Sequence, residues 1–192
     1  MNNEPLSITT LIAHWIVAFS IIGLLSMGFF MTFTGIPGLL GYHKSLGVIA
    51  FVFACGRMIW RCFEGWPPAT GSYTRLEHLL ARMTHWLLLS GSVALPVTGM
   101  LYAGAGGFGF DCFGLTIVAP NFLPDDPTNV EPYSEFLFMV GREGHSMIAY
   151  VMAAAVLLHI AAAVKHHLID RDTTLLRMTG KIRPAPRCHH DH

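Results

Sequence analysis

The sequence predicts an all-α fold, an integral membrane bundle of four helices. Two observations support this prediction. Of the 192 residues, 53% are hydrophobic and only 12% are charged, whereas about a quarter of the residues in an ordinary soluble domain carry charge. The apolar residues also gather in four stretches of roughly 20 residues, the length at which an α-helix crosses a ~30 Å hydrocarbon layer. We therefore expect residues 1–192 to form a single transmembrane domain in contact with membrane lipid.

The first two spans each begin with a histidine. The first span is expected at about residues 11–33, with His14 in its first turn. Glycine and proline residues in the link that follows stop the helix. The second span, at about 42–59, opens with His43, again in a first turn.

The third and fourth spans lie in the second half of the chain. The third span, at about 83–103, has His85 in its first turn. The long link 104–142 is rich in glycine and then in acidic residues, and a link of this length is typical of a functional or capping loop. The fourth span is expected at about 144–165, and a basic tail follows at 166–192.

Lysine and arginine are distributed unevenly between the two sides of the membrane. With four spans, both termini and the link between the second and third spans share one side, which holds ten of the 12 Lys and Arg residues. The other side holds only Lys44 and Arg142. Because positively charged segments stay in the cytoplasm, we predict that both termini are cytoplasmic.

Four histidines then fall at two depths in the membrane. His145 and His159 are 14 residues apart, so they share a helix face and lie ~21 Å apart along the axis. The predicted orientation puts His14 at the depth of His159, near the inner edge, and His43 at the depth of His145, near the outer edge. A lone histidine in a first helical turn is more often an interfacial residue. Two cross-helix pairs of costly intramembrane imidazoles favour a shared function instead.

Paired imidazoles at two depths are what two six-coordinate haems b require, because each iron takes one imidazole nitrogen from either side. No CxxCH motif is present, so covalent c-type attachment is not expected. We predict that His14 and His159 bind one haem iron and that His43 and His145 bind the other. Two imidazoles leave no open iron position, so the expected chemistry is outer-sphere electron transfer, and no catalytic residue is assigned.

Two further histidines are candidates for contacts with a quinone. His85 lies near the inner edge without a partner histidine at its depth, and His166 follows the fourth span beside Lys165. An interfacial or packing role is the alternative for His85, and a solvated basic helix end is the alternative for His166. The role of the Cys188–His192 tail stays open, as does the oligomeric state, and no nucleic-acid partner is expected.

Several motifs resemble those of the bacterial four-helix cytochrome b561 family. They are IAHW at 12–15, HKSLG at 43–47, ARMTHWLLL followed by ALPVTG at 81–99, and H-x6-HH-x-I-D-R-D-x-x-L-L-R-M at 159–178. The resemblance implies a di-haem b electron carrier of the bacterial inner membrane that exchanges electrons with ubiquinone. One branch of the family is similar to superoxide oxidase, which takes electrons from superoxide at the periplasmic face. Carried over by position, the family's haem ligands fall on the four paired histidines, and its quinone contacts fall near His85 and His166.

Two other functions remain open at this point. The first is a cytochrome b subunit that links quinone to a periplasmic redox partner protein, which would co-purify with it. The second is a haem-free, histidine-lined transporter of metal ions or protons, which would be colourless. The scarcity of carboxylates within the spans does not favour transport.

Overall fold

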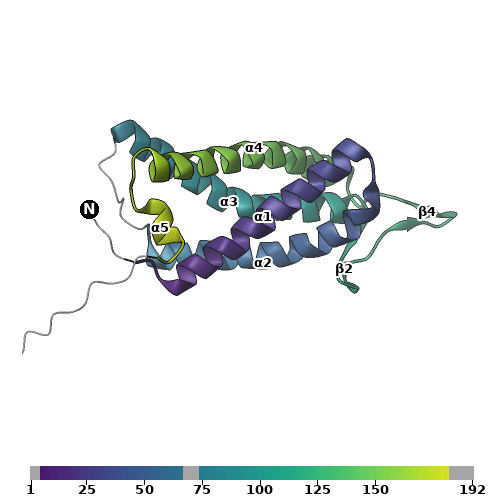
Figure 1. Ribbon diagram of the computed structural model, residues 1–192. Coiled ribbons are helices and arrows are strands. Elements are labelled where there is room, and N and C mark those ends of the chain that lie inside the picture. Colours follow the sequence, from purple (N-terminus) through teal and green to yellow (C-terminus); the bar gives the residue numbers. More distant parts are fainter. Residues whose placement is uncertain (1–4, 67–73, 182–192) are drawn as a thin grey trace, which may run out of the picture.

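The computed structural model describes residues 5–66 and 74–181, and four long antiparallel helices dominate it (Figure 1). All four are long and apolar enough to cross a membrane, which confirms the predicted bundle. Each predicted span lies inside one helix. The helices are α1 (Ile8–Thr34), α2 (Leu40–Glu64, preceded by the 3-10 turn η1, Pro37–Leu39), α3 (Arg75–Ala105) and α4 (Glu135–Leu168), and a short helix α5 (Thr174–Met178) follows.

The helices extend beyond the predicted spans because polar side chains accept hydrogen bonds from the backbone N–H groups of their first turns. The Ser7 hydroxyl accepts a hydrogen bond from the backbone N–H of Thr10 at the start of α1. Thr74 and Glu77 form a reciprocal capping box at the start of α3. Ser134 caps α4, so this helix begins at Glu135 and not near residue 144.

The link 104–142 contains two β-hairpins that the sequence analysis did not predict. They pair β1 (Phe110–Cys112) with β2 (Leu115–Val118) and β3 (Phe122–Leu123) with β4 (Asp126–Val130). In the first hairpin the two turn residues, Phe113 and Gly114, have φ of 49° and 93°. Positive φ at both positions is the backbone of a tight two-residue hairpin turn. Figure 1 shows both hairpins beyond one end of the bundle, which we call the hairpin end.

The opposite end, which we call the tail end, is closed by the chain after α4. The indole N–H of Trp15 donates to the backbone carbonyl of Met178 at 2.8 Å and so ties α5 to α1. Glu64, the last residue of α2, accepts hydrogen bonds from the hydroxyls of Ser7 and Thr10. The part of the predicted basic tail at 182–192 lies outside the described residues.

Apolar side chains cover the outside of the bundle as well as its centre. Phe19, Val52 and Leu157 are among many large hydrophobic residues that are more than half exposed on the helices, as expected for surfaces in contact with lipid. The centre holds one buried cluster from three helices: Val17, Ile21, Leu25, Leu95 and Met152.

A spacing of seven residues organises the interior into three layers. Seven residues return an α-helix to within ~20° of the same face, ~10.5 Å further along. Each long helix contributes one residue to each layer. The hairpin-end layer consists of Gly28, His43, Gly99 and His145. The middle layer consists of Ile21, Ala50, Ser92 and Met152, all at most 4% exposed. The tail-end layer consists of His14, Arg57, His85 and His159.

Candidate functional site: two facing imidazole pairs

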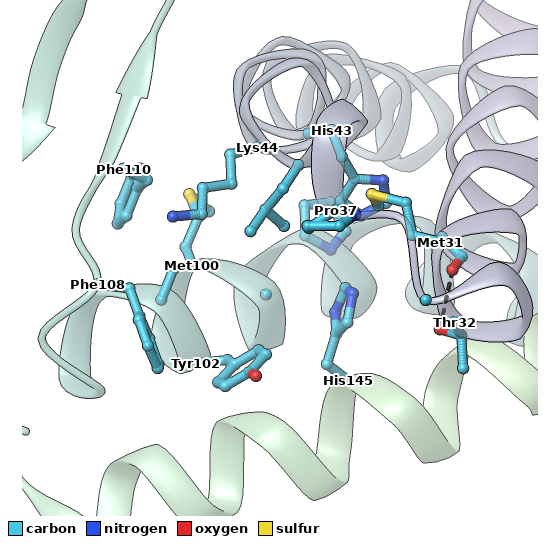
Figure 2. A pocket seen from close by; sticks show the side chains of 17 residues that line it. Met31, Thr32, Pro37, His43, Lys44, Met100, Tyr102, Phe108, Phe110 and His145 are labelled. Carbon is cyan, nitrogen blue, oxygen red and sulfur yellow. Dashed lines mark hydrogen bonds between the residues drawn. The ribbon is translucent and has the colours of Figure 1, made fainter. Parts of the chain in front are cut away.

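At the hairpin end, the side chains of His43 and His145 face each other across the bundle (Figure 2). The centroids of the two rings are 6.3 Å apart, and their planes are nearly perpendicular. Nδ1 of His145 lies 2.9 Å from the backbone carbonyl oxygen of Leu95. Because a carbonyl only accepts, Nδ1 carries the proton, and Nε2 presents its lone pair to the space between the helices. This arrangement is typical of a metal-binding histidine whose second nitrogen is held by the backbone.

A cavity of about 450 Å³ surrounds this pair, within the roughly 300–1,000 Å³ of ordinary ligand pockets. Nδ1 of His43 is buried and has no hydrogen-bond partner among the described residues. A glycine lies beside each ring, and at Gly99 an added Cβ atom would be closer than ordinary van der Waals contact. A Cβ atom at Gly28 would lie 3.4 Å from His43 Cε1, and one at Gly99 would lie 3.0 Å from His145 Cε1. Further lining residues, several of them visible in Figure 2, include Met31, Pro37, Lys44, Met100, Tyr102, Phe108 and Phe110.

At the tail end, His14 and His159 form a second pair. Their ring centroids are 6.5 Å apart, with an interplanar angle of 61°. Nη2 of Arg57 lies 3.2 Å from Nδ1 of His14. A guanidinium only donates, so Nδ1 accepts in this geometry. Coordination of a metal through Nε2 would instead place the proton on Nδ1, and Arg57 would then have to release this atom.

His85 also lies in the tail-end layer. Its ring centroid is 5.6 Å from that of His159 and 5.5 Å from the stacked ring of Trp66. The sequence analysis found no partner for it at this depth, but the structure places it directly beside His159. Three imidazoles and one guanidinium therefore meet at the tail end, whereas two imidazoles and two glycines meet at the hairpin end.

The distances between ring centroids show which histidine pairs could bind one metal ion from opposite sides. A metal–nitrogen bond of ~2.0–2.1 Å places the centroid of an imidazole ~3.2 Å from the metal, so two rings on opposite sides are ~6.4 Å apart. The pairs His43–His145 and His14–His159 match this separation within ~0.2 Å. The rings of His85 and His159 are closer together than this arrangement allows.

The paired histidines lie on helices that pack loosely or indirectly against each other. Helix α4 packs extensively against α3 but makes few contacts with α1. Each imidazole pair joins α4 to α1 or α2 and not to α3. The residues at the hairpin end therefore fit a haem iron held between two imidazoles. Those at the tail end fit one by their ring separation, provided that Arg57 releases Nδ1 of His14.

His166 belongs to a polar cluster at the C-terminal end of α4, outside the two pairs. Its Nδ1 is 2.6 Å from Oδ2 of Asp170, to which Lys165 donates at 2.9 Å. The hydrogen bond from Lys165, helped by His166, holds the pKa of the Asp170 carboxyl below its ordinary value. Asp170 therefore stays ionised at neutral pH, and it orients the imidazole of His166 by accepting from Nδ1.

The sequence analysis missed Arg57 and Gly99 as residues of these sites. Arg57 was counted only as one of the ten lysine and arginine residues that set the orientation. Yet Arg57 is 14 residues after His43, and Gly99 is 14 residues after His85, the same spacing that linked His145 to His159. Extending that spacing to all four helices would have found both residues.

Comparison with known proteins assigns a family. A family model described as "Prokaryotic cytochrome b561" matches residues 6–181. The chain is 29% identical over 176 residues to "Cytochrome b561 homolog 2" of Escherichia coli (strain K12), covering 88% of this chain and 87% of that protein. It is 27% identical over 141 residues to "Probable superoxide oxidase CybB" of Yersinia pestis, covering 73% of this chain and 74% of that protein.

Proposed function

The chain belongs to the prokaryotic cytochrome b561 family, a family of haem b membrane electron carriers, and we propose that it carries electrons through two haems b to ubiquinone. The observation that carries this proposal is the presence of two imidazole pairs, with ring centroids 6.3 and 6.5 Å apart, at opposite ends of one bundle. His43 and His145 would hold one haem, and His14 and His159 would hold the other.

The residues around the two proposed haems would favour electron transfer over the binding of O2. A haem iron with two imidazole ligands supplies reversible one-electron transfer between its ferric and ferrous states. If the four histidines held both irons through their imidazoles, no iron position would remain for direct binding of O2. Gly28 and Gly99 leave space beside the rings of His43 and His145. The middle layer, which is at most 4% exposed, excludes water between the two ends.

We place the hairpin end at the periplasmic face and the tail end at the cytoplasmic face. The concentration of lysine and arginine at the tail-end side supports this orientation, in a multi-pass protein of the inner membrane. Ubiquinone would then accept electrons near the cytoplasmic face. His166, oriented by Asp170 at 2.6 Å, and His85, beside His159, are the proposed quinone contacts.

Superoxide is the first proposed electron donor, on the strength of a relative that is named a probable superoxide oxidase. Two superoxide anions would each lose one electron and leave as O2, while one ubiquinone takes up two electrons and two protons to become the quinol. Lys44 would attract the anion locally, because it lines the cavity beside His43 and its ammonium group donates to the carbonyl of Gly109 at 2.9 Å.

A redox partner protein is the second proposed donor, and the charge of the hairpins favours it. Asp125 and Glu131 are exposed there. Hydrogen bonds from Thr128 and Asn129 lower the pKa of Asp126, which therefore stays ionised. Negative charge at this end repels superoxide and attracts a donor protein with a basic surface.

The first experiment is a reduced-minus-oxidised spectrum of the detergent-purified protein, with haem quantified as the pyridine haemochrome. We expect two low-spin haems b per chain. His14→Ala and His159→Ala should each remove one haem, and His43→Ala and His145→Ala should each remove the other. His85→Ala, the matched control, should keep both. A haem-free protein after expression with sufficient haem would refute the proposal and favour a histidine-lined transporter.

The donor is then identified with the protein that contains both haems. Rapid reduction of a soluble ubiquinone analogue by superoxide, slowed in Lys44→Gln, would support the first donor. Absence of this activity, together with salt-sensitive reduction by a basic c-type cytochrome, would support the second donor. In the second case the rate should fall as ionic strength rises, because salt screens the attraction between the two proteins.

A further inference from the structure

Both proposed sites consist of two histidines, but the residues beside these histidines differ between the two ends. In the hairpin-end layer, the positions not occupied by the proposed ligands are Gly28 and Gly99. In the tail-end layer, the corresponding positions are His85 and Arg57, and the guanidinium of Arg57 lies 3.2 Å from Nδ1 of His14. The tail-end layer thus has a fixed positive charge against an imidazole, and the hairpin-end layer has none. Lys44 lines the hairpin-end cavity, but its ammonium group is bound to the carbonyl of Gly109 and not to an imidazole.

Within residues 5–66 and 74–181, no carboxylate forms an ion pair with Arg57. The next arginine, Arg61, differs in this respect, because it pairs with Glu64 at 3.4 Å and lies over the ring of Trp66. Arg57 is also only partly exposed, and a charge inside the bundle is screened less than one in water.

We propose that Arg57 raises the reduction potential of the tail-end centre relative to the hairpin-end centre, and so directs electrons from the hairpin end to the tail end. This inference rests on the proposed function. The physical reason is that an oxidised haem iron carries one more positive charge than a reduced one. A nearby cation therefore disfavours the oxidised state.

The position of Arg57 makes this effect selective for one end. Arg57 and His43 are 14 residues apart on α2, or ~21 Å along the helix axis. The interaction between two charges falls with distance, so the effect of Arg57 on the hairpin-end centre is several-fold weaker. If Arg57 releases Nδ1 of His14 when a metal binds, its positive charge still stays nearby, because helix α2 keeps Arg57 in the tail-end layer.

The test is a potentiometric titration of the optical spectrum in the full-length protein with both haems. The variants Arg57→Gln and Arg57→Lys are compared with Arg61→Gln, a matched control one turn further along α2. The haem that remains in His43→Ala and the one that remains in His14→Ala identify the two components. Pyridine haemochrome quantitation accompanies each titration.

Arg57→Gln should lower the potential of the tail-end component by about 59 mV, equivalent to a tenfold change in its one-electron equilibrium. Arg57→Lys should retain most of the wild-type potential, and Arg61→Gln should shift it less. An unchanged tail-end potential in Arg57→Gln would overturn the inference. Equal shifts in the Gln and Lys variants, or in both haems, would also overturn it, because a general structural effect would then be responsible. Loss of haem from the wild-type protein would instead contradict the proposed function.

Discussion

Gly99→Ala tests whether the proposed hairpin-end site depends on the absence of a single side chain. The new Cβ atom would lie 3.0 Å from Cε1 and 3.1 Å from Nδ1 of His145, closer than van der Waals contact allows. His145 would have to move, and its 2.9 Å hydrogen bond to the carbonyl of Leu95 would weaken. The helix itself should tolerate alanine, which has a higher helix propensity than glycine.

The expected size of this effect follows from these two contacts. Relief of the overlap costs about 1–3 kcal/mol, and loss of the hydrogen bond adds about 1 kcal/mol. Haem binding at the hairpin end should therefore weaken by roughly 30- to 700-fold, since each 1.4 kcal/mol corresponds to a factor of ten. The tail-end site should keep its haem, because His14 and His159 do not contact this position.

The assay measures the haem-to-protein ratio before and after incubation with an excess of a haem-scavenging apoprotein. Gly99→Ala should fall from two haems to about one per chain, whereas the wild type should retain both. Gly23→Ala is the matched control, because a Cβ atom at this position would have no neighbouring atom within 4 Å. If Gly99→Ala kept both haems as firmly as the wild type, the proposed role of His145 and its cavity would be refuted.

Three further predictions concern the bundle and its tail end. Met152→Ala should lower the free energy of unfolding by roughly 2–5 kcal/mol, measured in detergent, because this side chain is 1% exposed in the middle layer. Glu64→Ala should destabilise the start of α1 by about 1–3 kcal/mol, seen as faster proteolysis there, because Thr10 and Ser7 lose their shared acceptor; unchanged cleavage would contradict this. Asp170→Asn should lower the melting temperature at neutral pH, but not once the pH falls below the depressed pKa of Asp170, because a lowered carboxyl pKa stabilises only the ionised form.

The sequence was sufficient to predict the four spans and the two histidine pairs, because both depend on regular periodicity. A run of roughly 20 apolar residues has few alternatives to a membrane helix. A separation of 14 residues fixes both the face and the depth of a side chain. The assignment of the four histidines as haem ligands stays a prediction until haem is measured.

The remaining features depend on contacts that periodicity alone does not give. The contact between Arg57 and His14 depends on how α1 and α2 pack. The hairpins 110–118 and 122–130 are too short to give a strong alternating pattern, and the capped start of α4 depends on the hydroxyl of Ser134. Local hydrogen bonds decide such boundaries, whereas hydrophobicity decides that the helix exists.

The layered interior explains how one bundle can hold two similar centres and still favour one direction of transfer. Two pairs of identical ligands cannot by themselves make the two ends different. The residues that share their layers can, because Gly28 and Gly99 bring no charge whereas Arg57 brings one. The buried middle layer separates the two ends, and a charge inside the bundle is screened less than one in water. The direction of electron transfer is therefore expected to depend on the residues beside the proposed ligands. Substitution of Arg57 should alter the difference between the two reduction potentials without removing either haem.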